Sequence, residues 1–255
     1  MKLITLNTWG GRAGKEKLLS FFKEQKDEID IFCLQEMWSA AYKDTVDAIA
    51  GGIPIKYEHV LTTGVQDISS IAHEHVSYFR PQCLDNYGLL TLIKNNIAVN
   101  SEGDIFVYRH RGYMPSGDRG THARNIQYVT FELNGRLVTV VNFHGLWNGK
   151  GKTDSEDRIQ QSKNIVSFVQ TLSSDVVFAG DLNLLPDTQS IKLFEDIGLL
   201  NLIKENNITS TRTSFYTKPD KYADYIFVSK GIKVNEFKVL PEEVSDHSAL
   251  FLDFE

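Results

Sequence analysis

Cysteine is scarce in this sequence of 255 residues, which contains two, Cys33 and Cys83. Two cysteines are too few for the disulfide framework that stabilises small secreted proteins. Cys33 lies in the apolar run Ile-Phe-Cys-Leu and is predicted to be a small core residue. The low cysteine content therefore favours a cytoplasmic location.

Long hydrophobic runs are also missing. No apolar stretch approaches the roughly 20 residues that a membrane-spanning helix needs, so no transmembrane segment is expected. The first apolar stretch covers only residues 3–6 and leads directly into Asn7, which is assigned to a functional site below. A cleaved signal peptide is not expected, because cleavage would remove that site residue.

An excess of positive charge is lacking as well. The 27 Lys and Arg residues are outnumbered by 33 Asp and Glu residues, for a net charge of -6. This balance argues against a protein that coats duplex DNA, although a nuclease with a small footprint stays open. Residues 109–124 are a local exception, interpreted as either a solvated loop or a substrate-binding loop. They contain Arg109, His110, Arg111, Arg119, His122 and Arg124 against one acid, Asp118.

The remaining composition is that of an ordinary globular protein, with 42% hydrophobic and 24% charged residues. No Pro/Ser/Gly-rich linker and no internal repeat divides the chain. We therefore expect a single domain over residues 1–255, and no obligate protein partner is evident.

Hydrophobic periodicity predicts a strand-rich chain with helices between the strands. Strands are expected at 3–6, 29–35, 57–61, 76–79, 89–93, 104–109, 126–133, 136–143, 176–179, 225–229, 234–240 and 249–254. Helices are expected at 15–28, 41–50 and 188–197, and a further helix is expected to open at residues 153–156 (Thr-Asp-Ser-Glu) with a capping box. The dipeptide Asn134-Gly135 suits a type I′ turn and predicts a hairpin. The fold class is mixed α/β, with room for two packed sheets.

Polar residues that can bind metals or phosphate follow or precede these strands. They are Asn7, Glu36, His144, Asp181, Asn183, Asp224, Asp246 and His247. In a mixed sheet, the exit of one strand and the entry of its antiparallel neighbour share a rim, so these side chains could converge. Hard oxygen ligands without a thiolate suit Mg²⁺ or Mn²⁺. These residues also have structural interpretations: Asn7 as a turn residue, His144 as a buried structural histidine, residues 181–183 as a turn cap, and residues 246–247 as a loop cap.

The same residues lie in motifs that resemble those of the endonuclease/exonuclease/phosphatase superfamily, with its deoxyribonuclease I-like fold. In chain order the motifs are Leu-Asn-Thr-Trp (6–9), Leu-Gln-Glu (34–36), Gly-Asp-Leu-Asn (180–183), Asp-Tyr-Ile (224–226) and Ser-Asp-His (245–247). The resemblance runs through nearly the whole chain. It implies a four-layer α/β sandwich in which two central mixed β-sheets are flanked by helices.

The resemblance also implies roles for the matching residues. Glu36 would be the principal ligand of a Mg²⁺ or Mn²⁺ ion, with Asn7 and Asp246 in or beside the metal shell. Asp181 would orient or deprotonate the attacking water, and Asn183 would hold water or phosphate. His247, supported by Asp224, would bind a phosphate oxygen, and a carboxylate beside the ring is expected to fix its tautomer and favour its charged form. His144 and Arg124 resemble the second histidine and the phosphate-contacting arginine of the deoxyribonuclease I-like and sphingomyelinase-like branches.

Departures from the family's patterns leave the subfamily unassigned. Trp9 stands where abasic-site endonucleases carry an acid, and Met37-Trp38 replaces their Thr-Lys. The signature of inositol polyphosphate 5-phosphatases is missing, since residues 221–226 read Lys-Tyr-Ala-Asp-Tyr-Ile. The leading hypothesis is a divalent-metal-dependent phosphodiesterase or nuclease that uses an activated water. The alternatives are a phosphatase or a sphingomyelinase-like phospholipid diesterase, and a non-catalytic binding module. Nucleic acid, nucleotide and phospholipid all stay open as substrates.

Two other motifs are set aside. Residues 149–153 (Gly-Lys-Gly-Lys-Thr) suggest a nucleotide P-loop, but position 146, which should be glycine, is leucine. Their lysines are instead expected to flank the site rim after His144. His73 and His75 have no apparent third metal ligand and are expected to have a surface or structural role.

Overall fold

The computed structural model of the chain describes residues 1–39, 63–115 and 121–255. The predicted helix at 41–50, the predicted strand at 57–61, and Asp118 and Arg119 of the basic segment lie outside the described residues. Among the residues described, no helix is long and apolar enough to cross a membrane.

Two mixed sheets of six strands each form the centre of the molecule. The first sheet has the order β11-β12-β1-β2-β4-β3 and consists of β1 (Lys2–Asn7), β2 (Ile31–Trp38), β3 (His75–Leu84), β4 (Tyr87–Lys94), β11 (Val234–Val239) and β12 (Leu250–Phe254). The second has the order β5-β6-β7-β8-β10-β9 and consists of β5 (Val99–Tyr108), β6 (Arg124–Leu133), β7 (Arg136–His144), β8 (Asp175–Asp181), β9 (Leu200–Asn201) and β10 (Asp224–Val228). β1 pairs with β2, and β7 with β8, in parallel.

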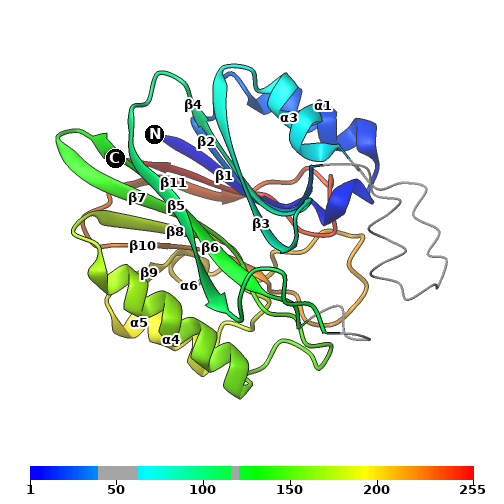
Figure 1. Cartoon of the computed structure of the whole chain (residues 1–255), viewed down its shortest axis with the longest axis vertical. Coiled ribbons are helices and arrows are strands. Elements are labelled where there is room, and N and C mark those ends of the chain that lie inside the picture. The colour runs from blue at the N-terminus through cyan, green and yellow to red at the C-terminus, as the bar shows by residue number, and fades with distance from the viewer. Residues whose placement is uncertain (40–62, 116–120) are drawn as a thin grey trace.

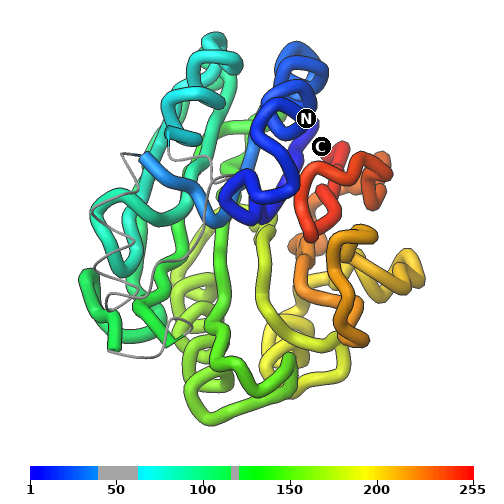
Figure 2. Tube along the Cα trace, turned by 90° about the vertical axis from the view of Figure 1, so that its right-hand side faces the viewer, coloured from blue at the N-terminus to red at the C-terminus, as the bar shows by residue number. Residues whose placement is uncertain are grey.

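Helices cover the outer face of each sheet (Figure 1). α1 (Lys15–Gln25) and α3 (Gly64–Ile71) lie on the first sheet, after the short 3-10 turn η1 (Trp9–Gly11). α4 (Glu156–Thr171), α5 (Gln189–Asp196) and the four-residue α6 (Leu202–Glu205) lie on the second. This arrangement confirms the predicted four-layer α/β sandwich. The two chain ends meet on one side of it, where Phe254 N donates to Met1 O at 2.8 Å (Figure 2).

The core follows the alternation of side chains along the strands. Ile4, Phe32 and Leu34 of the first sheet pack outward against Leu18 and Phe22 of α1. A second apolar cluster fills the space between the sheets and continues beneath α4 and α5. Burying these two sets of side chains is the main force that holds the four layers together.

A polar contact also joins the two sheets in the middle of the apolar core. Gln35 Nε2 donates to Asn142 Oδ1 at 2.7 Å, and Asn142 Nδ2 donates to the carbonyl oxygens of Leu34 and Leu90, each at 3.2 Å. Gln35 and Asn142 are completely buried. Because buried amides need partners, this network fixes how β2 and β7 face each other.

The hairpin prediction is confirmed, since Asn134 and Gly135 have φ angles of 52° and 77° between β6 and β7. The predicted capping box is wrong. α4 begins two residues later than the motif predicts, with Ser155 and not Thr153 as its N-cap, accepting from Arg158 N at 3.3 Å. Asp154 instead accepts from the backbone N–H groups of Gln189 and Ser190 at the start of α5. α3 was not predicted, and α1 ends three residues before the predicted boundary.

Candidate active site

Strand ends from both sheets meet at one rim and surround a cavity of about 250 Å³. β1, β2, β7 and β8 exit toward this rim, and β10 and β12 enter from it because they run antiparallel to their neighbours. Among the predicted site residues, the cavity is lined by Glu36, Arg124, His144, Asp181, Asn183, Asp246 and His247. The other two, Asn7 and Asp224, lie behind this lining and are hydrogen-bonded to it.

Glu36 reaches the cavity through an irregularity in β2. Alternation along the strand would place residue 36 on the same face as Phe32 and Leu34, beneath the helices. Between Leu34 and Met37 the pairing with β4 shifts, and Glu36 has a left-handed φ of 57°. A bulge of this kind re-aims a side chain. The Glu36 carboxylate therefore accepts from Asn7 Nδ2 at 3.3 Å and lies 3.5 Å from Arg12.

Asn7 connects the carboxylates of the two sheets. Its Nδ2 donates to Asp181 Oδ2 at 2.9 Å as well as to Glu36, while its Oδ1 accepts from Trp9 N at 2.9 Å. The amide thus presents N–H groups, not its oxygen, to the acidic residues. Asn7 lies beside the carboxylates and orients them.

Asp181 occupies the centre of the site because glycine precedes it. Gly180 has a φ of 144°, and a Cβ there would collide with the Phe143 carbonyl oxygen of the adjacent parallel strand. The close approach brings Asp181 Oδ2 within 3.7 Å of His144 Nε2 and 3.6 Å of His247 Nε2. Asp181 Oδ1 accepts from Asn183 N at 2.8 Å, and this turn holds the carboxylate in place.

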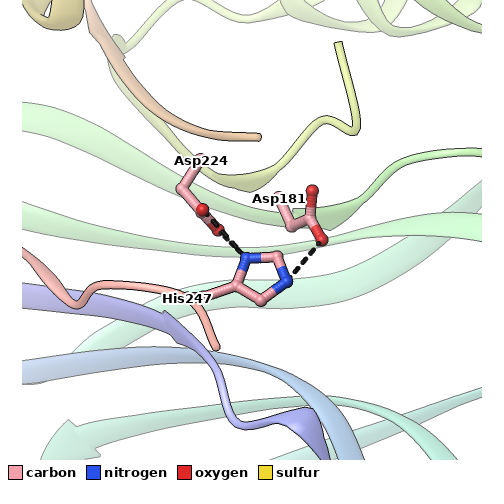
Figure 3. A group of neighbouring side chains, drawn as sticks. All are labelled: Asp181, Asp224 and His247. Carbon is pink, nitrogen blue, oxygen red and sulfur yellow. Dashed lines mark hydrogen bonds and ion pairs between the residues drawn. The ribbon is translucent and has the colours of Figure 1, made fainter. Parts of the chain in front are cut away.

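His247 lies between Asp224 and Asp181, with one ring nitrogen facing each carboxylate (Figure 3). Its Nδ1 is 2.9 Å from both oxygens of Asp224. The expectation that Asp224 keeps this ring charged is not supported. Burial outweighs the nearby carboxylates and lowers the pKa of His247 to about 3, and burial also raises the pKa of Asp224 to about 7. The ring is therefore neutral near pH 7, and Asp224 fixes its orientation.

Asp246 is held by an arginine that the sequence interpretation missed. Its Oδ2 is 2.9 Å from Arg212 Nη1, while its buried Oδ1 has no hydrogen-bond partner among the described residues. Burial raises the pKa of Asp246. Arg212 reaches the site because its backbone forms an isolated antiparallel bridge with His247. No local sequence pattern marks this pairing, since Arg212 lies outside any predicted strand.

The wall contributed by β6 and β7 is basic and buried. Arg124 is 2% exposed and lies beside His122 and His144, and burial holds the pKa of His144 well below its ordinary value. The rest of the described basic segment is elsewhere. The Arg109 guanidinium lies 5.2 Å from the rings of both Tyr108 and Tyr113, outside the cavity lining.

In the part of the chain that the structure describes, two groups of side chains could hold a divalent cation. Asp181, Asp224 and His247 each bring one ligand atom within 4.8 Å of the others. Their arrangement leaves little room for an ion, because the His247 ring stands between the two carboxylates, with Nδ1 2.9 Å from Asp224 and Nε2 3.6 Å from Asp181 (Figure 3). Glu36 and Asp246 fit better. They are hard oxygen donors on the cavity wall, and within the described residues the Asp246 Oδ1 atom accepts no hydrogen bond, its contact with His247 Nε2 being 3.7 Å.

Trp9, Arg12 and Tyr87 also line the cavity, and the other lining residues come from two loops. Trp147 and Lys152 follow β7, and Tyr216 and Lys218 precede β10. The sequence places lysines near the rim, but it gives no sign that Lys152 is buried. The P-loop pattern has no structural counterpart, since residues 149–153 lie in irregular structure. His75 is buried, with its Nε2 2.8 Å from the Ile29 carbonyl oxygen, as a structural histidine would be.

Comparison with known proteins gives a consistent result for the fold. A family model described as Endonuclease/Exonuclease/phosphatase family matches residues 4–247. No curated protein matches the chain in sequence.

Similar solved structures share the architecture at low sequence identity. An endonuclease/exonuclease/phosphatase from Bacteroides vulgatus is 16% identical with a TM-score of 0.73, covering 100% of this chain and 98% of its own. The mannosyl-6-phosphatase Bt3783 of Bacteroides thetaiotaomicron is 15% identical with a TM-score of 0.73, and the match covers 100% of this chain and 99% of the phosphatase. The human Nocturnin catalytic domain, with a bound sulfate anion, is 19% identical with a TM-score of 0.66, covering 100% and 93%.

Proposed function

Because this chain belongs to the endonuclease/exonuclease/phosphatase family, we propose that it is a divalent-metal-dependent phosphoesterase that hydrolyses its substrate with an activated water. The observation that carries this proposal is the surrounding of Asp181. Its Oδ2 atom is 2.9 Å from Asn7 Nδ2 and lies within 3.7 Å of a ring nitrogen of both His144 and His247. A carboxylate with these neighbours can hold and deprotonate a water next to a phosphoryl group.

The cation would be Mg²⁺ or Mn²⁺, held by Glu36 and Asp246 with Asn7 orienting Glu36. When bound, such an ion neutralises the phosphate ester and lowers the pKa of a coordinated water. The acidic side of the cavity has several carboxylates close together, and Glu36 contributes to the raised pKa of Asp246. A divalent cation would relieve that repulsion.

The other lining residues would stabilise charge on the phosphoryl oxygens. Arg124 is a permanent cation, and Asn183 offers amide N–H groups. A neutral histidine keeps one ring N–H, so His144 can donate a hydrogen bond to a phosphoryl oxygen while Asp181 takes the proton of the water. Removing one such fixed donor typically costs about 2.7–4 kcal/mol of transition-state stabilisation.

The volume of the cavity favours a substrate that places only its phosphate-bearing end inside. Ligand pockets for small molecules measure roughly 300–1,000 Å³, and this cavity of about 250 Å³ is close to the lower limit. The net charge of -6 disfavours extended contact with duplex DNA. A small phosphate ester or a nucleic-acid end is therefore proposed, and the similarity to a mannosyl-6-phosphatase supports the former. We further propose a cytoplasmic location, supported by two buried cysteines that form no disulfide.

Hydrolysis of a substrate panel tests this proposal. The panel contains plasmid DNA, single-stranded DNA and RNA, nucleotides, sugar phosphates, inositol phosphates, sphingomyelin and a chromogenic phosphodiester. Each substrate is incubated with Mg²⁺, with Mn²⁺ and with EDTA, for the wild type and for Asp181→Asn. The expected result is hydrolysis that requires the metal and is lost in the variant.

The outcome also separates the alternatives. The best substrate distinguishes a nuclease from a phosphatase or a phospholipid diesterase. Hydrolysis in EDTA, or equal hydrolysis by Asp181→Asn, would contradict the proposed chemistry. Failure to hydrolyse any substrate, by a protein that calorimetry shows to bind Mn²⁺, would favour the non-catalytic binding module.

A further inference from the structure

Lys152 is a buried cation on the cavity wall that the proposed hydrolysis does not use. The residue is 1% exposed and lies in the loop between β7 and α4. Its Nζ donates one hydrogen bond, to the Tyr222 carbonyl oxygen at 2.6 Å. Within the described parts of the chain, no carboxylate approaches Lys152 Nζ to within the 4.0 Å of an ion pair. An ammonium has three donors, so two are available to a ligand.

An aromatic ring with cations around it extends this basic surface. The Tyr216 ring centroid is 5.0 Å from Lys152 Nζ and 4.2 Å from the Arg212 guanidinium carbon. Lys218 lies 5.4 Å from the ring of Trp147, and all five residues line the cavity. Arg212 is already paired with Asp246, at 2.9 Å, so Lys152 is the buried cation of this group without a carboxylate partner among the described residues.

A purely structural role does not account for Lys152. Burying a charge without a partner is costly, and one hydrogen bond to a carbonyl could be made by a neutral amide. Such a cation at a solvent-open cavity is stabilised when an anion enters. The acidic side of the cavity, with Glu36 and Asp246, is the part assigned to the metal and the ester that is cleaved. Lys152 lies instead beside the Tyr216 ring, 5.0 Å from its centroid, and has no ion pair with Glu36 or Asp246.

We infer that Lys152, with Lys218 and the Tyr216 ring, forms a second anion subsite that binds a phosphate group other than the one hydrolysed. The substrate class is then a small phosphate ester that carries two phosphates. This inference rests on the proposed function, because the hydrolysed phosphate is assigned to the acidic side. It makes Lys152 a specificity-determining residue that selects bisphosphates over monophosphates.

Ligand binding to a hydrolysis-deficient protein tests the subsite. Isothermal titration calorimetry of Asp181→Asn with Mg²⁺ would compare three pairs of probes: pyrophosphate with phosphate, fructose 1,6-bisphosphate with fructose 6-phosphate, and adenosine 3′,5′-bisphosphate with adenosine 5′-monophosphate. The same titrations are then repeated after Lys152→Gln is introduced into the Asp181→Asn protein. Glutamine is chosen because it retains an N–H donor for the Tyr222 carbonyl. Lys150→Gln is the matched control, because Lys150 is exposed two residues away and outside the cavity lining.

The expected result is a preference of at least tenfold for the bisphosphate in at least one pair. Lys152→Gln should reduce that preference toward one, and Lys150→Gln should leave it unchanged. Equal affinity within all three pairs would overturn the inference. A Lys152→Gln protein that loses affinity equally for both members of a pair would also overturn it, because Lys152 would then contact the hydrolysed phosphate. These measurements need no turnover, so their failure is distinguishable from a failure of the proposed hydrolysis.

Discussion

His247 and Asp224 form a pair in which one residue orients the other, at 2.9 Å. We predict that His247→Ala lowers kcat by about 10²–10³-fold, the usual effect of losing one fixed group at the reacting centre. Asp224→Asn should lower kcat through the same histidine, so the double variant should be no slower than His247→Ala alone. Steady-state kinetics of the three variants checks this, with His110→Ala, an exposed histidine outside the cavity lining, as the control. Additive losses would show that Asp224 acts independently of the ring.

The charge of Lys152 should make anion binding depend on pH. Burial lowers the pKa of Lys152 to about 8 from 10.5; the other charged groups acting on it are Arg212, which lowers this pKa, and Asp181, Asp224 and Asp220, which raise it. Above pH 8 the folded protein loses this proton and, with it, affinity for a phosphate group. The ratio of pyrophosphate affinity between wild type and Lys152→Gln should therefore fall from pH 7 to pH 9.5. A constant ratio would contradict the prediction.

The lowered pKa of Lys152 affects folding stability in the opposite direction to anion binding: stability rises with pH where anion affinity falls. Between about pH 8 and pH 10.5 the unfolded chain keeps a proton on Lys152 that the folded protein has released. The unfolded state binds more protons in this window, so the contribution of Lys152 to the free energy of unfolding rises with pH. Lys152→Gln should lack this rise, which urea unfolding at pH 7.5 and pH 10 can measure against Lys150→Gln.

Among individual residues, the sequence predicts those site residues that lie at the end of a regular strand and have a side chain that can bind a metal or phosphate. Asp181, His144 and His247 are found this way because each lies next to a well-marked strand. Arg212 and Lys152 are not, since a bridge and a loop bring them to the cavity, and neither leaves a periodic pattern. The protonation state of His247 also could not be predicted, because it depends on burial and not on the neighbouring Asp224 alone.

Among the elements, α4 depends on its N-cap. The Ser155 hydroxyl accepts from Arg158 N at 3.3 Å and satisfies one of the helix's free N–H groups. We predict that Ser155→Ala lowers the free energy of unfolding by about 1 kcal/mol without changing KM. Ser167→Ala, in the exposed interior of the same helix, is the matched control and should be neutral. Urea denaturation of both variants tests this, and equal effects would argue against a capping role.

The bulge in β2 shows why predicting the strands does not by itself predict which side chains face the cavity. The sequence predicts a strand at 29–35, where the structure has β2 at Ile31–Trp38, and alternation alone would turn Glu36 away from the cavity. Its left-handed φ of 57° is set by pairing with β4 and by the contact with Asn7. These are long-range constraints, so the metal-ligand assignment of Glu36 came from the family resemblance and not from periodicity. The capping box failed for a related reason, because Asp154 is committed to α5.

At the scale of the whole molecule, the site depends on how the two sheets face each other. Gln35 precedes Glu36 in one sheet, and Asn142 lies two residues before His144 in the other. Their hydrogen bond of 2.7 Å therefore ties the acidic side of the cavity to the side that carries His144 and Asp181. The four-layer architecture could be anticipated from strand content and the resemblance, but this buried amide pairing could not.

We predict that Asn142→Ala lowers the free energy of unfolding by about 3 kcal/mol, because Gln35 loses one of its buried acceptors and the carbonyl oxygens of Leu34 and Leu90 lose their Asn142 donor. For a chain of this size that corresponds to a decrease in Tm of roughly 6–12 °C. Asn235→Ala is the control, since the Asn235 side chain is exposed and its hydrogen bond to Asp253 is long, at 3.4 Å. Differential scanning calorimetry gives both values. A Tm for Asn142→Ala within one degree of the control would show that the sheets are held together without this contact.

The central claim is that a water activated beside Asp181 attacks phosphorus. The most direct test is hydrolysis of the best panel substrate in H₂¹⁸O with Mg²⁺, followed by mass spectrometry of both products. We predict one ¹⁸O atom in the phosphate-bearing product of the wild type and no label above background for Asp181→Asn. Label in the alcohol product, or equal labelling of phosphate by the variant, would contradict the account.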